Sequence, residues 1–147
     1  MIRFFGGRVM TLANGIETQD IEVWTEGSKI VFVGKPTAEE LDGKVFEREY
    51  DLKGNLLMPS FKNAHTHSAM TFLRSYADDM PLQDWLFKQI FPMEAKLDGE
   101  KVYWLTKLAI LEYLTTGCTA AFDMYFELDD YVKACVESGF RSVLCGA

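Results

Sequence analysis

Histidine, proline and paired cysteine are all scarce in this sequence. Its 147 residues include two histidines, four prolines and three cysteines. The cysteines, Cys118, Cys135 and Cys145, cannot all pair within the chain, and none are in CxxC spacing. We therefore expect no disulfide framework, and reduced thiols in the cytoplasm are the simplest interpretation.

Long apolar runs and an excess of basic charge are also missing. No stretch of 18 apolar residues occurs, so we expect no membrane-spanning helix. The first residues lack the continuous apolar core of a signal peptide. The formal net charge is −7, which argues against binding to nucleic acid or to an anionic membrane.

Short strands separated by turns are expected over the first fifty-five residues. Residues 2–12 form an apolar run that ends at the turn pair Asn14-Gly15. Further apolar runs begin at Ile21, Ile30 and Val45. Four short strands at this spacing predict a small antiparallel sheet.

From Leu56 onward the pattern changes to alternating strands and helices. The apolar run at residues 56–58 predicts a strand buried on both faces. Pro81 is expected to open a helix that Pro92 ends. Two more helices are expected at residues 99–116 and 129–137, and two more strands at residues 119–122 and 140–144. Asp98 is the expected cap at the start of the first helix, and Gly117 and Gly139 are the expected caps at the ends of the two helices.

This alternation predicts the α/β class, with parallel strands joined by helical crossovers. Three parallel strands alone leave open edges and a bare face, so we expect either more chain or a second copy to cover them.

The pair His65-Thr66-His67 carries the clearest chemical signal. Residues i and i+2 of a strand point to the same face, so two imidazoles spaced in this way can share one metal ion. The pair follows the strand predicted at residues 56–58 and precedes a long loop. A chance pair of surface histidines is the alternative interpretation.

The stretch MPSFKNAHTH, residues 58–67, resembles the PGFxNxHTH segment of the amidohydrolase superfamily. The resemblance extends over residues 70–74, 84–86, 92–94, 116–117 and 123–126, and is closest to the 5-methylthioadenosine/S-adenosylhomocysteine deaminase branch. Guanine deaminases and triazine hydrolases are similar but more distant. Ser60 departs from the family, which usually has glycine there.

The resemblance implies the first strands and helices of a (β/α)8 TIM barrel over residues 56–147. Residues 1–55 then correspond to the N-terminal part of a small β-sandwich, and the chain is an incomplete domain. It implies one divalent metal ion, Zn²⁺ or Fe²⁺, with His65 and His67 as two ligands. The remaining ligands and the proton-moving residues would lie beyond Ala147, so no catalytic residue is expected within this chain.

The implied reaction is deamination of an adenosine-like nucleoside. Metal-activated water attacks the ring carbon that bears the amino group, and ammonia leaves. The alternatives are hydrolysis of another C–N or C–Cl bond on a heteroaromatic ring, and an inactive scaffold that keeps a relic histidine pair. We expect a small-molecule nucleoside or heteroaromatic substrate as the partner, and other copies of the chain as a second candidate partner. We expect binding to neither nucleic acid nor membrane.

Two further residues match positions that contact the nucleoside in these deaminases, namely Trp85 and Glu94. A carboxylate suits ribose because it can accept hydrogen bonds from two hydroxyls. The alternatives are a core role for Trp85 and a solvated loop charge for Glu94. Asp123, near the end of a predicted strand, is interpreted as orienting a neighbour by hydrogen bonding rather than binding metal.

Overall fold

The computed structural model describes residues 1–13 and 15–146, so Asn14 of the predicted turn pair lies outside the described residues. The chain divides into two compact units, Met1–Pro59 and Ser60–Ala147. The first unit has two sheets and the second has one, and each unit has its own buried residues.

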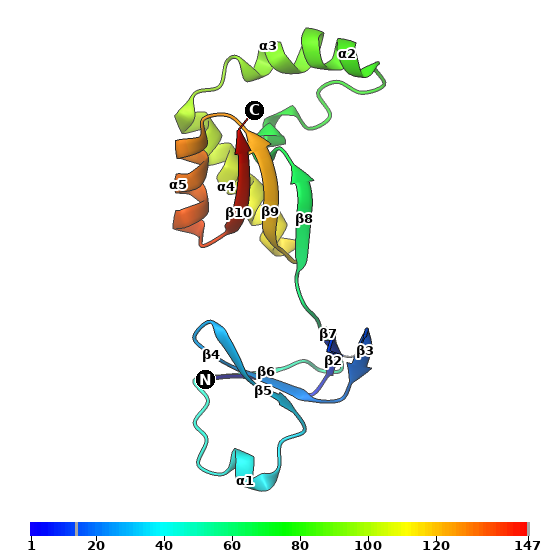
Figure 1. The fold of residues 1–147 in the computed structure, drawn as a ribbon, viewed down its shortest axis with the longest axis vertical. Coiled ribbons are helices and arrows are strands. Elements are labelled where there is room, and N and C mark those ends of the chain that lie inside the picture. Colours follow the sequence, from blue (N-terminus) through cyan, green and yellow to red (C-terminus); the bar gives the residue numbers. More distant parts are fainter. Residues whose placement is uncertain (14, 147) are drawn as a thin grey trace. The chain divides into compact units, whose positions relative to one another are not determined.

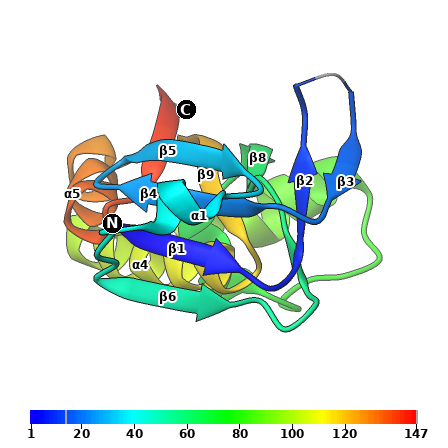
Figure 2. The same ribbon diagram turned by 90° about the horizontal axis from the view of Figure 1, so that it is seen from below.

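Strands dominate the first unit (Figures 1 and 2). One sheet has the strand order β5-β4-β1-β6 and a second has the order β3-β2-β7. Among the buried side chains, Trp24 is 3% exposed and stacks on Phe32 with ring centroids 4.2 Å apart. The elements of this unit are β1 (Ile2–Phe5), β2 (Arg8–Thr11), β3 (Glu17–Gln19), β4 (Glu22–Glu26), β5 (Lys29–Gly34), α1 (Ala38–Leu41), β6 (Arg48–Asp51) and β7 (Leu56–Leu57).

The single strand predicted at residues 2–12 is wrong, because the chain breaks at Gly6 and Gly7 into β1 and β2. Gly6 has a φ of 70°, and a Cβ there would lie 2.3 Å from Asp51 Oδ1. The predicted antiparallel sheet is also wrong in part. β4 pairs antiparallel with β1, but β6 pairs parallel with it. Pairing direction depends on how the intervening chain crosses over, which the apolar pattern does not record.

The second unit alternates strands and helices, as the sequence predicts. Its elements are β8 (Phe61–Thr66), the 3₁₀ helix η1 (Ser68–Leu73), α2 (Leu82–Asp84), the π-helix η2 (Trp85–Ile90), α3 (Phe91–Glu94), α4 (Gly99–Thr115), β9 (Cys118–Tyr125), α5 (Leu128–Ser138) and β10 (Arg141–Gly146).

The three strands of this unit are parallel, in the order β10-β9-β8 (Figure 1). Side chains of β9 alternate in burial: Ala121, Asp123 and Tyr125 are buried, whereas Phe122 and Met124 are exposed. Because α4 packs against β9 and α5 against β10, the helices cover one face of the sheet. The other face leaves apolar side chains uncovered within the described residues.

The strand predicted at residues 56–58 is misplaced. Leu56 and Leu57 form β7, which pairs with β2 in the first unit, and Leu56 is 43% exposed rather than buried on both faces. The strand that leads to the histidines is β8, which begins two residues after Pro59. Three apolar residues in a row cannot indicate which sheet they join, and Lys62 and Asn63 make β8 look polar.

The helix predicted between Pro81 and Pro92 begins as expected but does not end at Pro92. Its backbone passes from α2 through η2, where the Phe91 N–H bonds to the Leu86 carbonyl, into α3. Pro92 lies in the first turn of α3, where a missing N–H needs no partner within that helix.

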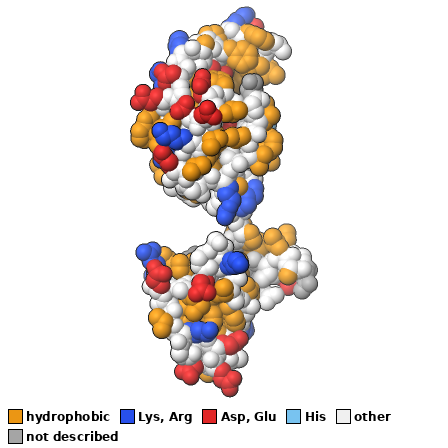
Figure 3. Space-filling view, turned by 60° about the vertical axis from the view of Figure 1, so that its left-hand side comes forward, with side chains coloured by type: hydrophobic (Ala, Val, Ile, Leu, Met, Phe, Trp, Pro, Cys, Tyr) orange, Lys and Arg blue, Asp and Glu red, His pale blue; other side chains and the backbone are white. Residues whose placement is uncertain are grey.

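The cap signals of the longer helices are confirmed. The Asp98 side chain accepts from the Lys101 N–H at the start of α4, and Gly139 ends α5 in the left-handed conformation. No helix among the described residues combines the length and apolar character needed to cross a membrane. Apolar side chains nevertheless reach the surface of both units between charged ones (Figure 3).

Candidate metal and substrate site

The two histidines lie at the carboxyl end of β8, the edge at which all three parallel strands end (Figure 1). Between Asn63 and Thr66 the pairing register with β9 shifts, so that three residue steps on β8 match two on β9. Such a bulge adds one residue beside His65 and re-aims the side chains that follow. The simple two-residue alternation assumed from the sequence is therefore modified at the site itself.

The rings of His65 and His67 meet edge to face, with centroids 5.0 Å apart. His67 Nδ1 lies 2.8 Å from the backbone oxygen of Met124. A carbonyl oxygen only accepts, so Nδ1 must carry a proton, and the neutral ring then has its lone pair on Nε2. A carbonyl that holds one ring nitrogen is the usual arrangement of a metal-ligating histidine, so His67 fits a ligand of a divalent ion, and the His65 ring lies beside it.

A tyrosine of α4 holds the residues that alternate with the histidines. The Tyr113 hydroxyl lies 2.6 Å from Thr66 Oγ1 and 3.0 Å from Ser68 Oγ. Burial raises the pKa of Tyr113, so its hydroxyl stays protonated near neutral pH and can donate to one neighbour while accepting from the other. The backbone of the histidine segment is thereby fastened from the helix-covered side of the sheet.

Asp123 is fully buried and belongs to the same network. The Ser68 N–H lies 3.3 and 3.2 Å from its two carboxylate oxygens, and the Ser68 hydroxyl also donates to Oδ2. These contacts fit the interpretation that Asp123 orients a neighbour. That neighbour is Ser68, the residue directly after His67.

A pocket of about 340 Å³ lies beside the histidine segment. Its walls are mostly apolar, with His67 and Glu94 among the few polar side chains. The lining residues are His67, Met70, Trp85, Leu86, Ile90, Phe91, Glu94, Met124, Tyr125 and Phe126. Mostly apolar walls with a few convergent polar groups are typical of small-molecule sites.

The structure brings three of the four predicted site residues to this pocket, and His65 is not among its lining residues. Trp85 donates its Nε1–H to the Ala77 carbonyl at 3.0 Å, which leaves the ring as part of the wall. Glu94 is half-buried, and its Oε1 accepts from the Tyr125 hydroxyl at 2.9 Å. Glu94 is therefore not a freely solvated loop charge.

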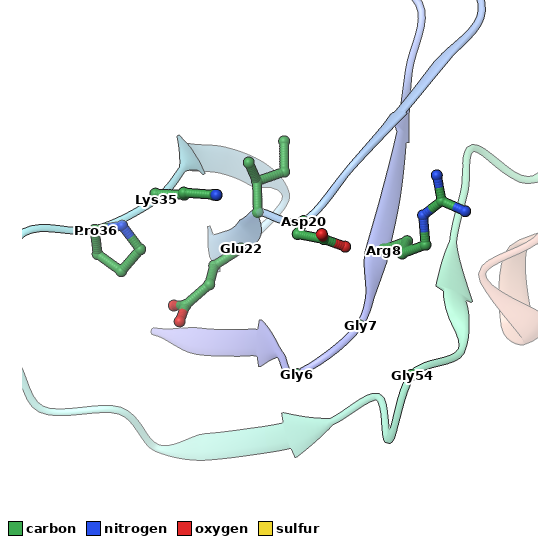
Figure 4. A pocket seen from close by; sticks show the side chains of 9 residues that line it. Gly6, Gly7, Arg8, Asp20, Glu22, Lys35, Pro36 and Gly54 are labelled. Carbon is green, nitrogen blue, oxygen red and sulfur yellow. The ribbon is translucent and has the colours of Figure 1, made fainter.

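A different depression lies in the first unit and is lined by residues that include Gly6, Gly7, Asp20, Glu22 and Lys35 (Figure 4). Glu22 is already committed there: its carboxylate accepts two hydrogen bonds of 2.7 Å from a neighbouring arginine, which lowers its pKa. Charges of both signs and a satisfied carboxylate make this depression a poor candidate for the chemistry that the histidine pair implies.

Sequence reasoning missed the two tyrosines of the site, Tyr113 and Tyr125. Tyr125 lies within residues 123–126, over which the resemblance to the family extends, and this was the available signal for it. Tyr113 gave no such signal, because its partners lie 45 and 47 residues away in the chain. No group of three or more His, Cys, Asp or Glu side chains within residues 1–13 and 15–146 is arranged to hold a metal ion.

Comparison with known proteins supports the resemblance seen in the sequence. The 5-methylthioadenosine/S-adenosylhomocysteine deaminase of Desulfitobacterium hafniense is 43% identical over 123 residues, which span 84% of this chain and 28% of that protein. The 5′-deoxyadenosine deaminase of Methanospirillum hungatei is 56% identical over 94 residues, which span 64% of this chain and 21% of that protein.

Among solved structures, a zinc-bound adenosine deaminase from Xanthomonas campestris superposes with a TM-score of 0.89 at 34% identity. The match covers 97% of this chain and 33% of that one. The chain thus spans between about a fifth and a third of the length of these relatives.

The amidohydrolase family matches residues 56–147, more than half of the chain. The histidine pair, the pocket at the strand ends and the similar proteins all agree with that match. The resemblance predicted from the sequence is confirmed, and the chain belongs to the amidohydrolase family.

Proposed function

We propose that this chain is the N-terminal part of a metal-dependent enzyme that deaminates an adenosine-like nucleoside such as 5′-methylthioadenosine, adenosine or S-adenosylhomocysteine. The observation that carries the proposal is one pocket, at the carboxyl ends of parallel strands, lined by His67, Trp85 and Glu94. The deaminases named above support it as similar proteins.

We also propose a complete fold for the longer protein, of which the described residues are one part. The sequence puts the boundary at residue 56, but β7 pairs with β2 in the first unit. We therefore propose that the residues from Ser60 onward supply the first strands and helices of a (β/α)8 barrel, and that those up to Pro59 form part of a β-sandwich. Active sites of such barrels lie at the carboxyl ends of the strands, which is the edge occupied by the histidines.

We propose His65 and His67 as two ligands of one divalent ion, Zn²⁺ in the first instance. The fit rests on the 5.0 Å separation of the rings and on the carbonyl that holds His67 Nδ1. When bound, the ion supplies the acidity that activates water for attack on a ring carbon. The chain has only two histidines, so the remaining ligands are proposed to come from outside these 147 residues.

The pocket residues have distinct proposed roles. The Trp85 ring forms a wall against which a flat base packs, and the largely apolar lining excludes water from the reacting ring. Glu94 presents a carboxylate oxygen to the ribose hydroxyls.

In the longer protein that is proposed to contain this chain, kcat/KM for adenosine or 5′-methylthioadenosine is expected to exceed kcat/KM for guanine. Glu94→Ala should lower kcat/KM for the nucleosides by roughly 5- to 150-fold, since an unpaired ribose diol costs about 1–3 kcal/mol. Ammonia release measured at several substrate concentrations gives both constants.

Glu100→Ala, an exposed glutamate in the first turn of α4, serves as the control and should leave kcat/KM near the wild-type value. A preference for the free base guanine would favour the guanine deaminase alternative. Hydrolysis of a chlorinated triazine with no ammonia release from adenosine would favour the triazine hydrolase alternative.

A further inference from the structure

The carboxylate of Glu94 is held by a buried tyrosine from another element of the unit. Tyr125, at the carboxyl end of β9, is 3% exposed and stacks on Phe126 with ring centroids 4.3 Å apart. Its hydroxyl reaches Glu94 Oε1 at 2.9 Å. The hydrogen bond therefore ties the end of α3 to the sheet across the pocket wall.

The direction of this hydrogen bond follows from chemistry. Burial and the neighbouring Glu94 both raise the pKa of Tyr125, so its hydroxyl stays protonated across the physiological range and donates to the carboxylate. Within the described residues, the other oxygen of Glu94, Oε2, has no hydrogen-bond partner. One oxygen is fixed and the other is free to accept.

We infer that Tyr125 is a positioning residue that sets Glu94 for recognition of a ribose diol, an inference that rests on the proposed function. A glutamate has three rotatable side-chain bonds, and freezing them when substrate binds weakens binding. Tyr125 restricts them beforehand by holding Oε1. Because Tyr125 acts through Glu94, its effect appears only with substrates that carry the hydroxyls which Glu94 contacts.

Two substrates that differ only in the diol, adenosine and 2′,3′-dideoxyadenosine, isolate this effect in the longer protein. Tyr125→Phe keeps the buried ring and removes the hydroxyl. It should lower kcat/KM for adenosine about 10-fold, in line with the loss of a hydrogen bond to a charged group, and leave kcat/KM for dideoxyadenosine unchanged. The ratio of the two constants is insensitive to partial misfolding, because misfolded protein lowers both equally.

Tyr131→Phe is the matched control. Tyr131 is fully buried, and its hydroxyl lies 2.8 Å from Ser142 Oγ rather than at the pocket. This variant should keep the wild-type ratio. In the double variant Glu94→Ala/Tyr125→Phe, the loss of the tyrosine hydroxyl should have no further effect on the ratio, because its target is gone.

The outcomes separate the two proposals. A wild-type protein that deaminates neither nucleoside overturns the proposed function and this inference with it. A wild-type protein that prefers adenosine, paired with a Tyr125→Phe variant whose ratio is unchanged, overturns the inference alone. A lowered ratio in Tyr125→Phe but not in Tyr131→Phe supports it.

Discussion

Replacement of His65 by alanine is expected to remove most of the metal from the longer protein and to lower its deaminase activity by more than about 100-fold. Loss of a residue that only orients a metal ligand already costs about 10- to 100-fold in affinity or activity, so the loss of a ligand should cost more. His67→Ala should behave in the same way, since both rings lie at the end of β8. Elemental analysis of the purified variants measures the metal content directly.

Lys62→Ala is the control for these two variants. Lys62 lies on the same strand, is exposed, and bonds to Ser60 and Thr119 rather than to either histidine. Its replacement should leave the metal content unchanged. Equal metal content in wild type and His65→Ala would contradict the assignment, even if activity fell, because the histidine would then act without holding the ion.

Asp123→Ala is expected to destabilise the chain by about 3 kcal/mol. The side chain is fully buried, and its carboxylate accepts from both the N–H and the hydroxyl of Ser68. Alanine would leave the buried Ser68 N–H without an acceptor, remove one of the two partners of the Ser68 hydroxyl and open a small cavity. Each unsatisfied buried polar group costs about 1–3 kcal/mol. Urea denaturation of the 147-residue chain, followed by circular dichroism, measures the change in the free energy of unfolding.

Asp78→Ala provides the matched control, because Asp78 is an exposed aspartate in the loop before α2. Its free energy of unfolding should stay within about 0.5 kcal/mol of wild type. If Asp123→Ala were as mild as the control, the buried network behind the histidines would not be the anchor that its hydrogen bonds indicate.

Local signals predicted most of the second unit correctly. Asp98 begins α4 and Gly139 ends α5, as their positions beside periodic apolar segments indicate. These signals work because a cap satisfies backbone groups within a few residues of itself. The errors occur where the deciding contact is distant. Leu56 joins β2, some 48 residues earlier in the chain, and no local feature distinguishes that pairing from one with β9.

The site residues also divide into those that the sequence indicated and those that only distant contacts bring together. The two-residue spacing of His65 and His67 identified a metal-binding candidate, and the family resemblance implied Trp85 and Glu94 as pocket candidates. Their roles stay proposals, but the pocket that gathers three of them is a feature of the structure.

The sequence by itself determined the family, the helix caps and the histidine spacing. Tertiary structure alone decided the bulge beside His65, the carbonyl that selects the His67 tautomer, and the two tyrosines that hold Thr66, Ser68 and Glu94. The physical reason is the separation along the chain over which each interaction acts. Caps and spacing act over one turn or two residues, whereas these contacts join atoms from segments 31 to 57 residues apart, which only the folded sheet and its helices bring together.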